Sequence, residues 1–508
     1  MKNKFQPIIF SLLIILGILI GKNLNNNKNI DTNEKINSII NLINSNYVDS
    51  VNKNFEDQII NSIIKDLDPH TSYISKKNYQ SVEENMLGGF SGIGIEFNII
   101  DDTIVVVSPI NGGPSQKLGI ISGDRIVTVD SINVASIGIE NNDVIKKLRG
   151  EKGTKVSVQI KRRGLTDLIP FSIIRNTIPL NSVDVSLIIN DSIGFIKLNR
   201  FSAKTTSEFN KASSDLLKSG MKKLILDLRD NPGGYLSAAV NICDNILKRG
   251  ELIVYTMGRM RDKTEIYSEK TNDLENIKIA ILINEGSASA SEIIAGAIQD
   301  NDRGVIIGRR SFGKGLVQEE IRMNDGSAIR LTTQRYYTPS GRSIQKDYEE
   351  NNEEYFMEQF ARKESILPDS LKYKTKLGRE VYGGGGINPD IKIQRDTTLN
   401  FKMINLILIN GWIRDFSMQY SDRNRNNIFK TTSSKEYLSK IEEILLSQFM
   451  KYIDDIDTGI SKKLNKADKK YLKKQIKANI ARNLWSTEDY YRIIIDDDEY
   501  VKAALNHN

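Results

Sequence analysis

The stretch IKIAILINEGSASASEIIAGAIQDNDRGVIIG, residues 277–308, contains two strand-like runs on either side of a helical pattern. The runs IKIAILIN and GVIIG are short, apolar and bounded by turn residues, which is typical of buried strands. Between them, an apolar stripe recurs at helical spacing: Ile293, Ile294, Ala297 and Ile298. A strand, a helix and a strand in this order predict a βαβ crossover in a parallel sheet.

The same alternation extends toward the N-terminus. The strand-like runs SIGFIKL and KKLILDL come earlier in the chain, with helical stretches around 205–218 and 235–248. Residues 190–310 therefore predict an α/β core, with the loops at the strand C-termini as the place for a site. Farther on, Asn324-Asp325-Gly326 joins two β-rich runs and predicts a hairpin.

Other parts of the chain have different patterns. Residues 31–87 carry apolar residues at helical spacing and predict a small helical region. Residues 88–175 consist of short β-rich runs between Gly, Asp and Asn turns and predict a compact β-rich module. The α/β core is assigned to residues 176–395, and a helical extension to residues 396–508. In this extension one apolar stripe recurs every four residues: Leu472, Ile476, Ile480 and Leu484.

Composition excludes several classes of protein. The 508 residues include 71 Lys plus Arg and 64 Asp plus Glu, and this net charge of +7 is not concentrated in any long block. A nucleic-acid partner is therefore not expected. Cys243 is the only cysteine, which excludes an intrachain disulfide, and its apolar helical surroundings predict a buried side chain. With only His70 and His507 as histidines, a His-rich metal site is not expected.

An apolar run near the N-terminus predicts export. PIIFSLLIILGILIG, residues 7–21, follows Lys2 and Lys4 and has the length of a signal peptide. No small-x-small cleavage site follows, so we expect an uncleaved membrane helix and an Asn-rich tether within residues 1–30. The rest of the chain would then lie on the periplasmic side of the cell envelope. The alternative is a buried core helix.

Three serines open the helical part of the quoted stretch: Ser287, Ser289 and Ser291. Ser289 and Glu292 match the S-x-x-E capping box, in which both side chains bind free backbone N–H groups. The other interpretation is a nucleophile, because the free N–H groups of a helix N-terminus can hold an oxyanion. The segment by itself leaves both interpretations open.

A serine nucleophile needs a base within hydrogen-bond reach, and histidine is nearly absent from this chain. A lysine can serve if burial lowers its pKa. Lys314 in SFGKGLVQ lies among glycines and apolar residues, and Gln318 follows four positions later with an amide that adds no charge. The alternative for Lys314 is a solvated side chain in a glycine loop.

An oxyanion hole is the third requirement. The segment DLRDNPGGYL, residues 227–236, contains Gly233 and Gly234, whose backbone N–H groups can approach a carbonyl closely. The N–H of Ala290, next to Ser289, is a further donor. As a plain connector the segment would need no function.

Six motifs in chain order resemble one family. LDPHTSYI, LDLRDNPGG, NEGSASASEI, SFGKGLVQ, RYYTPSGRSIQ and VYGGGGINPD, spread over residues 35–395, closely resemble the C-terminal processing peptidases, also called tail-specific proteases. The resemblance implies a crotonase-like α/β protease core and a Ser-Lys dyad. Its implied site residues are Ser289 as nucleophile, Lys314 as general base, Gln318 as the residue orienting the base, and Gly233, Gly234 and Ala290 as the oxyanion hole. It also implies that His70 is structural.

The family places a PDZ domain ahead of the protease core, and residues 88–175 resemble one. FSGIGIEF would be the carboxylate-binding loop and the adjoining strand, with Gly92, Ile93, Gly94 and Ile95 as the peptide-binding residues. A bound peptide would add to the sheet as an extra strand. Residues 396–508 match no part of the family pattern.

The predicted fold class is therefore a multidomain α/β protein with an N-terminal helical region, a β-rich PDZ domain, a protease core and a helical C-terminal extension. The predicted function is a serine endopeptidase that recognises free C-terminal tails of proteins or peptides and needs no metal or organic cofactor. The membrane would be a further partner through the N-terminal helix, and a homo-oligomer is compatible with the sequence. Two alternatives remain: an inactive PDZ adaptor that binds tails, and a crotonase-type acyl-CoA enzyme.

Overall fold

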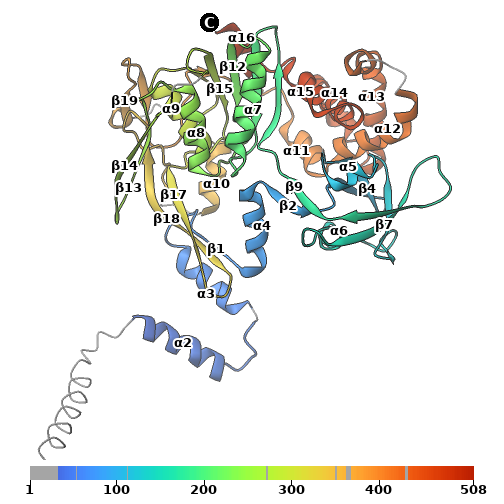
Figure 1. The fold of residues 1–508 in the computed structure, drawn as a ribbon, viewed down its shortest axis with the longest axis horizontal. Helices are drawn as coiled ribbons and strands as arrows, with labels where there is room; N and C mark the ends of the chain where they lie inside the picture. The colour runs from blue at the N-terminus through green and yellow to red at the C-terminus, as the bar shows by residue number, and fades with distance from the viewer. Residues whose placement is uncertain are drawn as a thin grey trace, which may run out of the picture. The chain divides into compact units, whose positions relative to one another are not determined.

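The computed structural model describes residues 32–507, apart from 53, 111, 271–272, 349–351, 362–367 and 429–432. The chain divides into two units, residues 1–66 and 67–508. In the first unit, α2 spans Thr32–Asn46 and α3 spans Phe55–Ile64 (Figure 1). All elements named below belong to the second unit.

The predicted membrane anchor needs correction. Across the described ranges, no helix combines the length and the apolar character that a membrane span requires. Residues 7–21, to which the anchor was assigned, lie outside the described residues. The expected attachment to the cell envelope through a membrane helix is therefore not supported.

The quoted stretch forms the predicted crossover. β15 (Lys278–Ile283), α9 (Ala290–Asp300) and β16 (Val305–Gly308) follow one another, and the two strands pair in parallel with Ala280 opposite Val305. The preceding alternation is also confirmed: β11 (Ile193–Leu198), α7 (Thr205–Lys218), β12 (Lys223–Asp227) and α8 (Leu236–Ile246). The sheet has the order β10-β11-β12-β15-β16-β21. Its outer strands are β10 (Val183–Ile188) and β21 (Ile391–Lys392).

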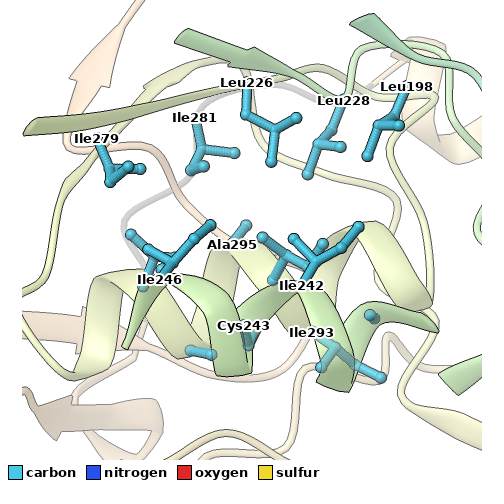
Figure 2. Close-up of a cluster of buried hydrophobic side chains, with 14 of the residues drawn as sticks. Leu198, Leu226, Leu228, Ile242, Cys243, Ile246, Ile279, Ile281, Ile293 and Ala295 are labelled. Carbon is cyan, nitrogen blue, oxygen red and sulfur yellow. The ribbon is translucent and has the colours of Figure 1, made fainter. Parts of the chain in front are cut away.

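Both faces of this sheet are covered, because successive side chains of a strand point to opposite faces. One face packs on α8 and α9, where Leu226 and Ile281 lie opposite Ile242 and Ala295 (Figure 2). Cys243 is part of this cluster and is buried, as predicted. The other face packs on C-terminal helices, α15 (Thr487–Ile495) and α16 (Glu499–Asn506).

A second sheet has the order β1-β18-β13-β14, with β17 paired to β18. Its strands are β1 (Ser72–Ile74), β13 (Leu252–Gly258), β14 (Arg261–Tyr267), β17 (Leu316–Arg322) and β18 (Ala328–Tyr337). The hairpin predicted at residues 324–326 is confirmed, since β17 and β18 pair antiparallel on either side of it. Short elements lie between β18 and β21: α10 (Asn352–Ala361), η1 (Asp369–Leu371), β19 (Lys372–Lys374) and β20 (Glu380–Tyr382).

The β-rich module follows α4 (Lys76–Leu87), and its sheet has the order β3-β4-β5-β7-β8. The strands are β3 (Ile95–Ile100), β4 (Thr103–Pro109), β5 (Arg125–Val129), β6 (Ile132–Asn133), β7 (Lys155–Lys161) and β8 (Ile169–Ile174). The short helix α5 (Pro114–Lys117) and the longer α6 (Asn141–Leu148) complete it. β2 (Gly89–Gly92) enters the module and β9 (Asn176–Pro179) leaves it, and these two strands pair with each other.

The C-terminal extension is helical, as predicted. It contains α11 (Phe401–Ile409), α12 (Trp412–Ile428), α13 (Ser434–Ile456), η2 (Ser461–Lys463) and α14 (Lys466–Leu484). The apolar stripe predicted in α14 is buried: Leu472, Ile476, Ile480 and Leu484. These side chains join a cluster that includes Phe449 of α13 and Ile413 of α12.

Candidate active site

Ser289 is distinguished from its two neighbouring serines by where its side chain lies. Ser287 and Ser291 are fully buried, and their hydroxyls donate to backbone oxygens of Leu228 and Asn231, at 2.8 and 2.9 Å. Ser289 instead lines a cavity of about 770 Å³. The two flanking serines therefore connect the start of α9 to the loop after β12 by hydrogen bonds. Of the three serines, only Ser289 lines the cavity.

The backbone at Ser289 is unusual for a residue with a side chain. Ser289 is the residue before the first turn of α9, with φ of 55° and ψ of −113°. A positive φ is costly for an L-residue and recurs at functional sites. The capping box predicted from the sequence is also present, and the Glu292 carboxylate accepts a hydrogen bond from the Ser289 N–H at 2.8 Å. A capping contact with Glu292 and a side chain that lines the cavity are therefore combined in one residue.

Lys314 lines the same cavity as Ser289. Its Nζ donates to Oε1 of Gln318 at 2.7 Å, and Nε2 of Gln318 donates to the backbone oxygen of His70 at 2.6 Å. Burial, followed by the positive charge of Arg330, lowers the pKa of Lys314 to about 8. About a tenth of this amine is therefore uncharged at pH 7, and the uncharged form is the one that a general base requires.

Glu292 connects the two loops that carry Ser289 and Lys314. It is completely buried, and its carboxylate accepts hydrogen bonds from the N–H groups of Ser289, Gly313 and Lys314 and from the hydroxyl of Ser311. Burial raises the pKa of Glu292, and these four donors oppose that shift. The sequence indicated Glu292 only as a cap; its contacts with the 311–314 loop depend on the fold.

Tyr336 on β18 makes a second connection between the same loops. Its hydroxyl lies 2.7 Å from the backbone oxygen of Lys314 and 3.1 Å from that of Ser289, so the two oxygens share its one proton, and its ring is buried. The residue lies within the motif RYYTPSGRSIQ, which gave no indication of this role. Ser289 and Lys314 are thus each held through their own backbone.

The predicted oxyanion residues lie at this site with different roles. The N–H of Gly233 donates to Oδ1 of Asn231 at 2.9 Å, so it is already engaged. Within the described part of the chain, no acceptor binds the N–H of Gly234 or of Ala290. Gly233 instead permits close approach, because a Cβ there would lie 2.9 Å from Cβ of Ser289. Gly234 and Ala290 are therefore the available donors.

The cavity has an apolar side and a charged rim. The apolar side includes Met86, Leu87, Leu236, Ile293 and Leu316. On the rim, Arg330 pairs with Glu320 at 3.0 Å, and Arg322 pairs with Glu83 of α4. An apolar pocket beside the Ser289 hydroxyl and the Lys314 amine can bind an uncharged side chain.

His70 contributes to the site through its backbone. Its ring lies edge-on to Phe312, Tyr355 and Phe356, and Nε2 lies 2.8 Å from the hydroxyl of Tyr355. Burial, followed by the positive charge of Lys314, lowers the pKa of His70 to about 3. The side chain thus lies in an aromatic cluster, and the backbone oxygen supports Gln318.

The predicted peptide-binding residues of the β-rich module lie at the start of an edge strand. Gly92 ends β2, Ile95 begins β3, and β3 pairs only with β4 among the described strands. The oxygen of Ile93 accepts hydrogen bonds from the N–H and hydroxyl of Ser115, which fix this loop. Gly94 has φ of 76°, a conformation that favours glycine.

Metal-ligating residues do not gather near this site. Among the residues with a described placement, no group of His, Cys, Asp or Glu is arranged to hold a metal ion.

Family models match three separate parts of the chain. The model of peptidase family S41 matches residues 192–353, and a PDZ domain model matches residues 91–169. Residues 403–486 match a family of unknown function, DUF8443.

Individual relatives are carboxy-terminal processing proteases. The chain is 40% identical over 291 residues to the carboxy-terminal-processing protease of Bartonella bacilliformis. The aligned residues make up 56% of this chain and 66% of that relative. It is 36% identical over 283 residues to the carboxyl-terminal-processing protease of a Picosynechococcus species. These residues make up 55% of this chain and 67% of that relative. This chain therefore spans about two thirds of the length of each of these two relatives.

Among solved structures, the photosystem II D1 C-terminal processing protease is similar, with a TM-score of 0.37 and 26% identity. The similarity covers 69% of this chain and 85% of that one. On the evidence of the sequence relatives and the family models, the chain belongs to peptidase family S41 and to its carboxy-terminal processing proteases, which are serine-type peptidases.

Proposed function

We propose that this chain is a serine endopeptidase in which Ser289 is the nucleophile and Lys314 the general base. One observation carries the proposal: Ser289 and Lys314 line the same cavity, while the serines on either side of Ser289 are buried and bonded to backbone. The Glu292 carboxylate binds backbone N–H groups of both residues and supports their pairing.

The reaction would begin with proton transfer. The uncharged amine of Lys314 accepts the proton of the Ser289 hydroxyl while its oxygen attacks the scissile carbonyl. Gln318 accepts a hydrogen bond from Nζ and so keeps the amine oriented during this step. The protonated Lys314 then gives its proton to the leaving amine, which leaves an acyl-enzyme on Ser289.

Negative charge develops on the carbonyl oxygen as the nucleophile attacks. The N–H groups of Ala290 and Gly234 are the donors assigned to this oxygen, because neither has an acceptor in the described structure. The N-terminus of α9 adds favourable electrostatic potential at the same place. Water activated by Lys314 then hydrolyses the acyl-enzyme and restores the free hydroxyl.

Substrate recognition is assigned to the PDZ domain. Backbone N–H groups at Gly92, Ile93, Gly94 and Ile95 would hold the terminal carboxylate, and the peptide would pair with the free edge of β3. The substrate class is therefore a protein or peptide with a free C-terminal tail.

The test compares cleavage of a tailed protein by the wild type, Ser289→Ala and Lys314→Ala. Each variant should reduce kcat by about 10³-fold or more while circular dichroism stays unchanged. Exposed Ser219→Ala is the matched control for the serine variant, because that serine lies at the C-terminal end of α7. Cleavage by Ser289→Ala at the wild-type rate would contradict the proposed nucleophile.

A further inference from the structure

The C-terminal helix α16 contacts both loops of the candidate site, through Arg229 of the loop after β12 and Arg309 of the segment after β16. It packs on the sheet face opposite α9, where Tyr500, Val501 and Ala504 join a cluster with strand residues including Ile225 and Ile307. The end of the helix is fixed by Lys223 of β12, whose Nζ donates to the backbone oxygen of Ala504 at 2.6 Å. The helix lies outside the residues matched by the S41, DUF8443 and PDZ models.

Arg229 joins α16 to the loop that carries the oxyanion glycines. Its Nε and Nη2 donate to the buried carboxylate of Asp227, at 3.0 and 2.6 Å. The remaining terminal nitrogen, Nη1, donates to Oδ2 of Asp498 at 2.7 Å. Because the guanidinium is fixed on two sides, α16 restrains the first turn of the 227–234 loop.

From Arg229 the restraint continues to the nucleophile through hydrogen bonds. Asp230 binds the side chain of Asn284 twice: its N–H donates to Oδ1 and its Oδ1 accepts from Nδ2, both at 2.8 Å. The backbone oxygen of Asn231 accepts the Ala288 N–H at 3.0 Å and the Ser291 hydroxyl at 2.9 Å. The loop that carries Gly234 is thus held between α16 on one side and the serine segment on the other.

Tyr500 contacts both active-site loops with a single ring. The guanidinium carbon of Arg229 lies 4.6 Å from the ring centroid, and that of Arg309 lies 5.5 Å from it. Arg309 directly follows β16 and begins the segment that leads to Lys314. A Cβ at Gly308 would lie 2.7 Å from the ring, so this glycine gives the ring its room.

The ring of Tyr500, rather than its hydroxyl, makes these contacts. Within the described structure, the hydroxyl is buried and has no hydrogen-bond partner. Removing it should cost nothing in hydrogen bonding, whereas removing the ring takes away the surface on which both arginines lie.

We propose that Asp498 and Tyr500 of α16 are positioning residues for catalysis, which hold the oxyanion loop through Arg229 and the base loop through Arg309. The inference rests on the proposed function, since it concerns the same Ser289, Lys314 and Gly234. It assigns a catalytic contribution to residues at the C-terminal end of the chain.

Two variants remove these contacts while keeping the helix. Asp498→Asn keeps an N-cap, because Oδ1 of Asp498 accepts the N–H groups of Tyr500 and Val501 and asparagine caps equally well. It replaces the oxygen that faces Arg229 by a donor. Tyr500→Leu removes the ring, and Tyr500→Phe is the conservative variant that keeps it. Asp497→Asn is the matched control, because the adjacent Asp497 pairs only with the exposed Lys470 and Lys502 within the described structure.

The first readout is kinetic. Asp498→Asn and Tyr500→Leu should each lower kcat by about tenfold or more with KM little changed, since a misplaced catalytic group slows the reaction even when the substrate still binds. Tyr500→Phe should recover the kcat that Tyr500→Leu loses. The inference is overturned if Asp498→Asn and Tyr500→Leu keep the wild-type kcat, or if kcat falls only in proportion to the unfolded fraction.

The second readout does not depend on activity. Hydrogen exchange of the 228–234 amides should become faster in Asp498→Asn, while exchange in the middle of α9 stays at the wild-type rate. Unchanged exchange of this loop in Asp498→Asn overturns the inference, including when Tyr500→Leu fails to fold. An inactive wild type would overturn the proposed function, and the exchange measurement would still decide the positioning role.

Discussion

Glu292 is one buried side chain that binds the backbones of both proposed catalytic residues. Each of its two oxygens accepts two hydrogen bonds: Oε1 from Ser311 and Gly313, and Oε2 from Ser289 and Lys314. Buried polar groups with complete partners fix local geometry, and partly satisfied ones are costly. The position of Ser289 relative to Lys314 therefore depends on a carboxylate with both oxygens available as acceptors.

Replacing Glu292 by glutamine tests this dependence. The amide has one acceptor oxygen, so its NH₂ group would face two donors in the same buried site. We expect kcat to fall by about 100-fold, and the free energy of unfolding to fall by about 1–3 kcal/mol. Steady-state kinetics and urea unfolding measure the two effects. Glu319→Gln, at a half-buried position of β17, is the control, and a Glu292→Gln enzyme with wild-type kcat would refute the role.

The lowered pKa of Lys314 predicts how activity depends on pH. Only the uncharged amine can accept the serine proton, so kcat/KM should rise with pH through an apparent pKa of about 8. Arg330→Gln removes a positive charge that lowers this pKa, so the rise should move to higher pH. A pH profile of both enzymes measures the shift. A profile that rises at the same pH in Arg330→Gln would show that Arg330 does not act on the base.

Among the helices, α14 shows burial that follows directly from sequence spacing. Ile476 is completely buried in this helix, whereas Ile444 of the neighbouring α13 is 55% exposed. Removing a buried isoleucine leaves a cavity that a well-packed core fills only in part. The two positions therefore provide a matched pair.

Ile476→Ala should lower the free energy of unfolding by about 2–5 kcal/mol. Ile444→Ala should change it by no more than about 0.5 kcal/mol, because an exposed side chain loses little on truncation. Urea unfolding followed by circular dichroism measures both values. Equal losses at the two positions would contradict the packing described for the C-terminal extension.

For the chain as a whole, recognition and cleavage are assigned to different parts of the second unit. Gly94 lies at the entry to β3 with a positive φ, and a Cβ there would lie 2.9 Å from Ile178. The cavity that contains Ser289 is lined by residues of α4, the protease core and β18, and none of them lies between residues 88 and 175. A change at Gly94 should therefore affect tail binding before it affects chemistry.

Gly94→Val should raise KM for a tailed protein by about tenfold or more, because a β-branched residue is strained at positive φ and distorts the loop. Cleavage of a short peptide without the tail should stay within about twofold of the wild type. Parallel assays of the two substrates measure the difference. Equal losses for both substrates would mean that the β-rich module does not select tails.

The sequence predicted those features that depend on neighbouring residues. The spacing of apolar residues was sufficient to predict the crossover of β15, α9 and β16 and the buried stripe of α14. Apolar residues at helical spacing bury one face of a helix, and a continuous apolar run buries both faces of a strand. It was also sufficient to single out Ser289 and Lys314 as candidates, since each is identified by the residue types beside it. The N-terminal membrane helix was expected from the same kind of local pattern and is not supported.

Tertiary structure decided what distant segments do to one another. Only the fold shows that Ser287 and Ser291 are buried, that Asn231 engages the N–H of Gly233, and that Gly234 stays available. It likewise brings Tyr336 from β18 and Tyr500 from α16 to the two site loops. These contacts join residues up to hundreds of positions apart, and the spacing of neighbours carries no information about them. Long-range packing and hydrogen bonding therefore decided how the candidate residues are arranged at the site.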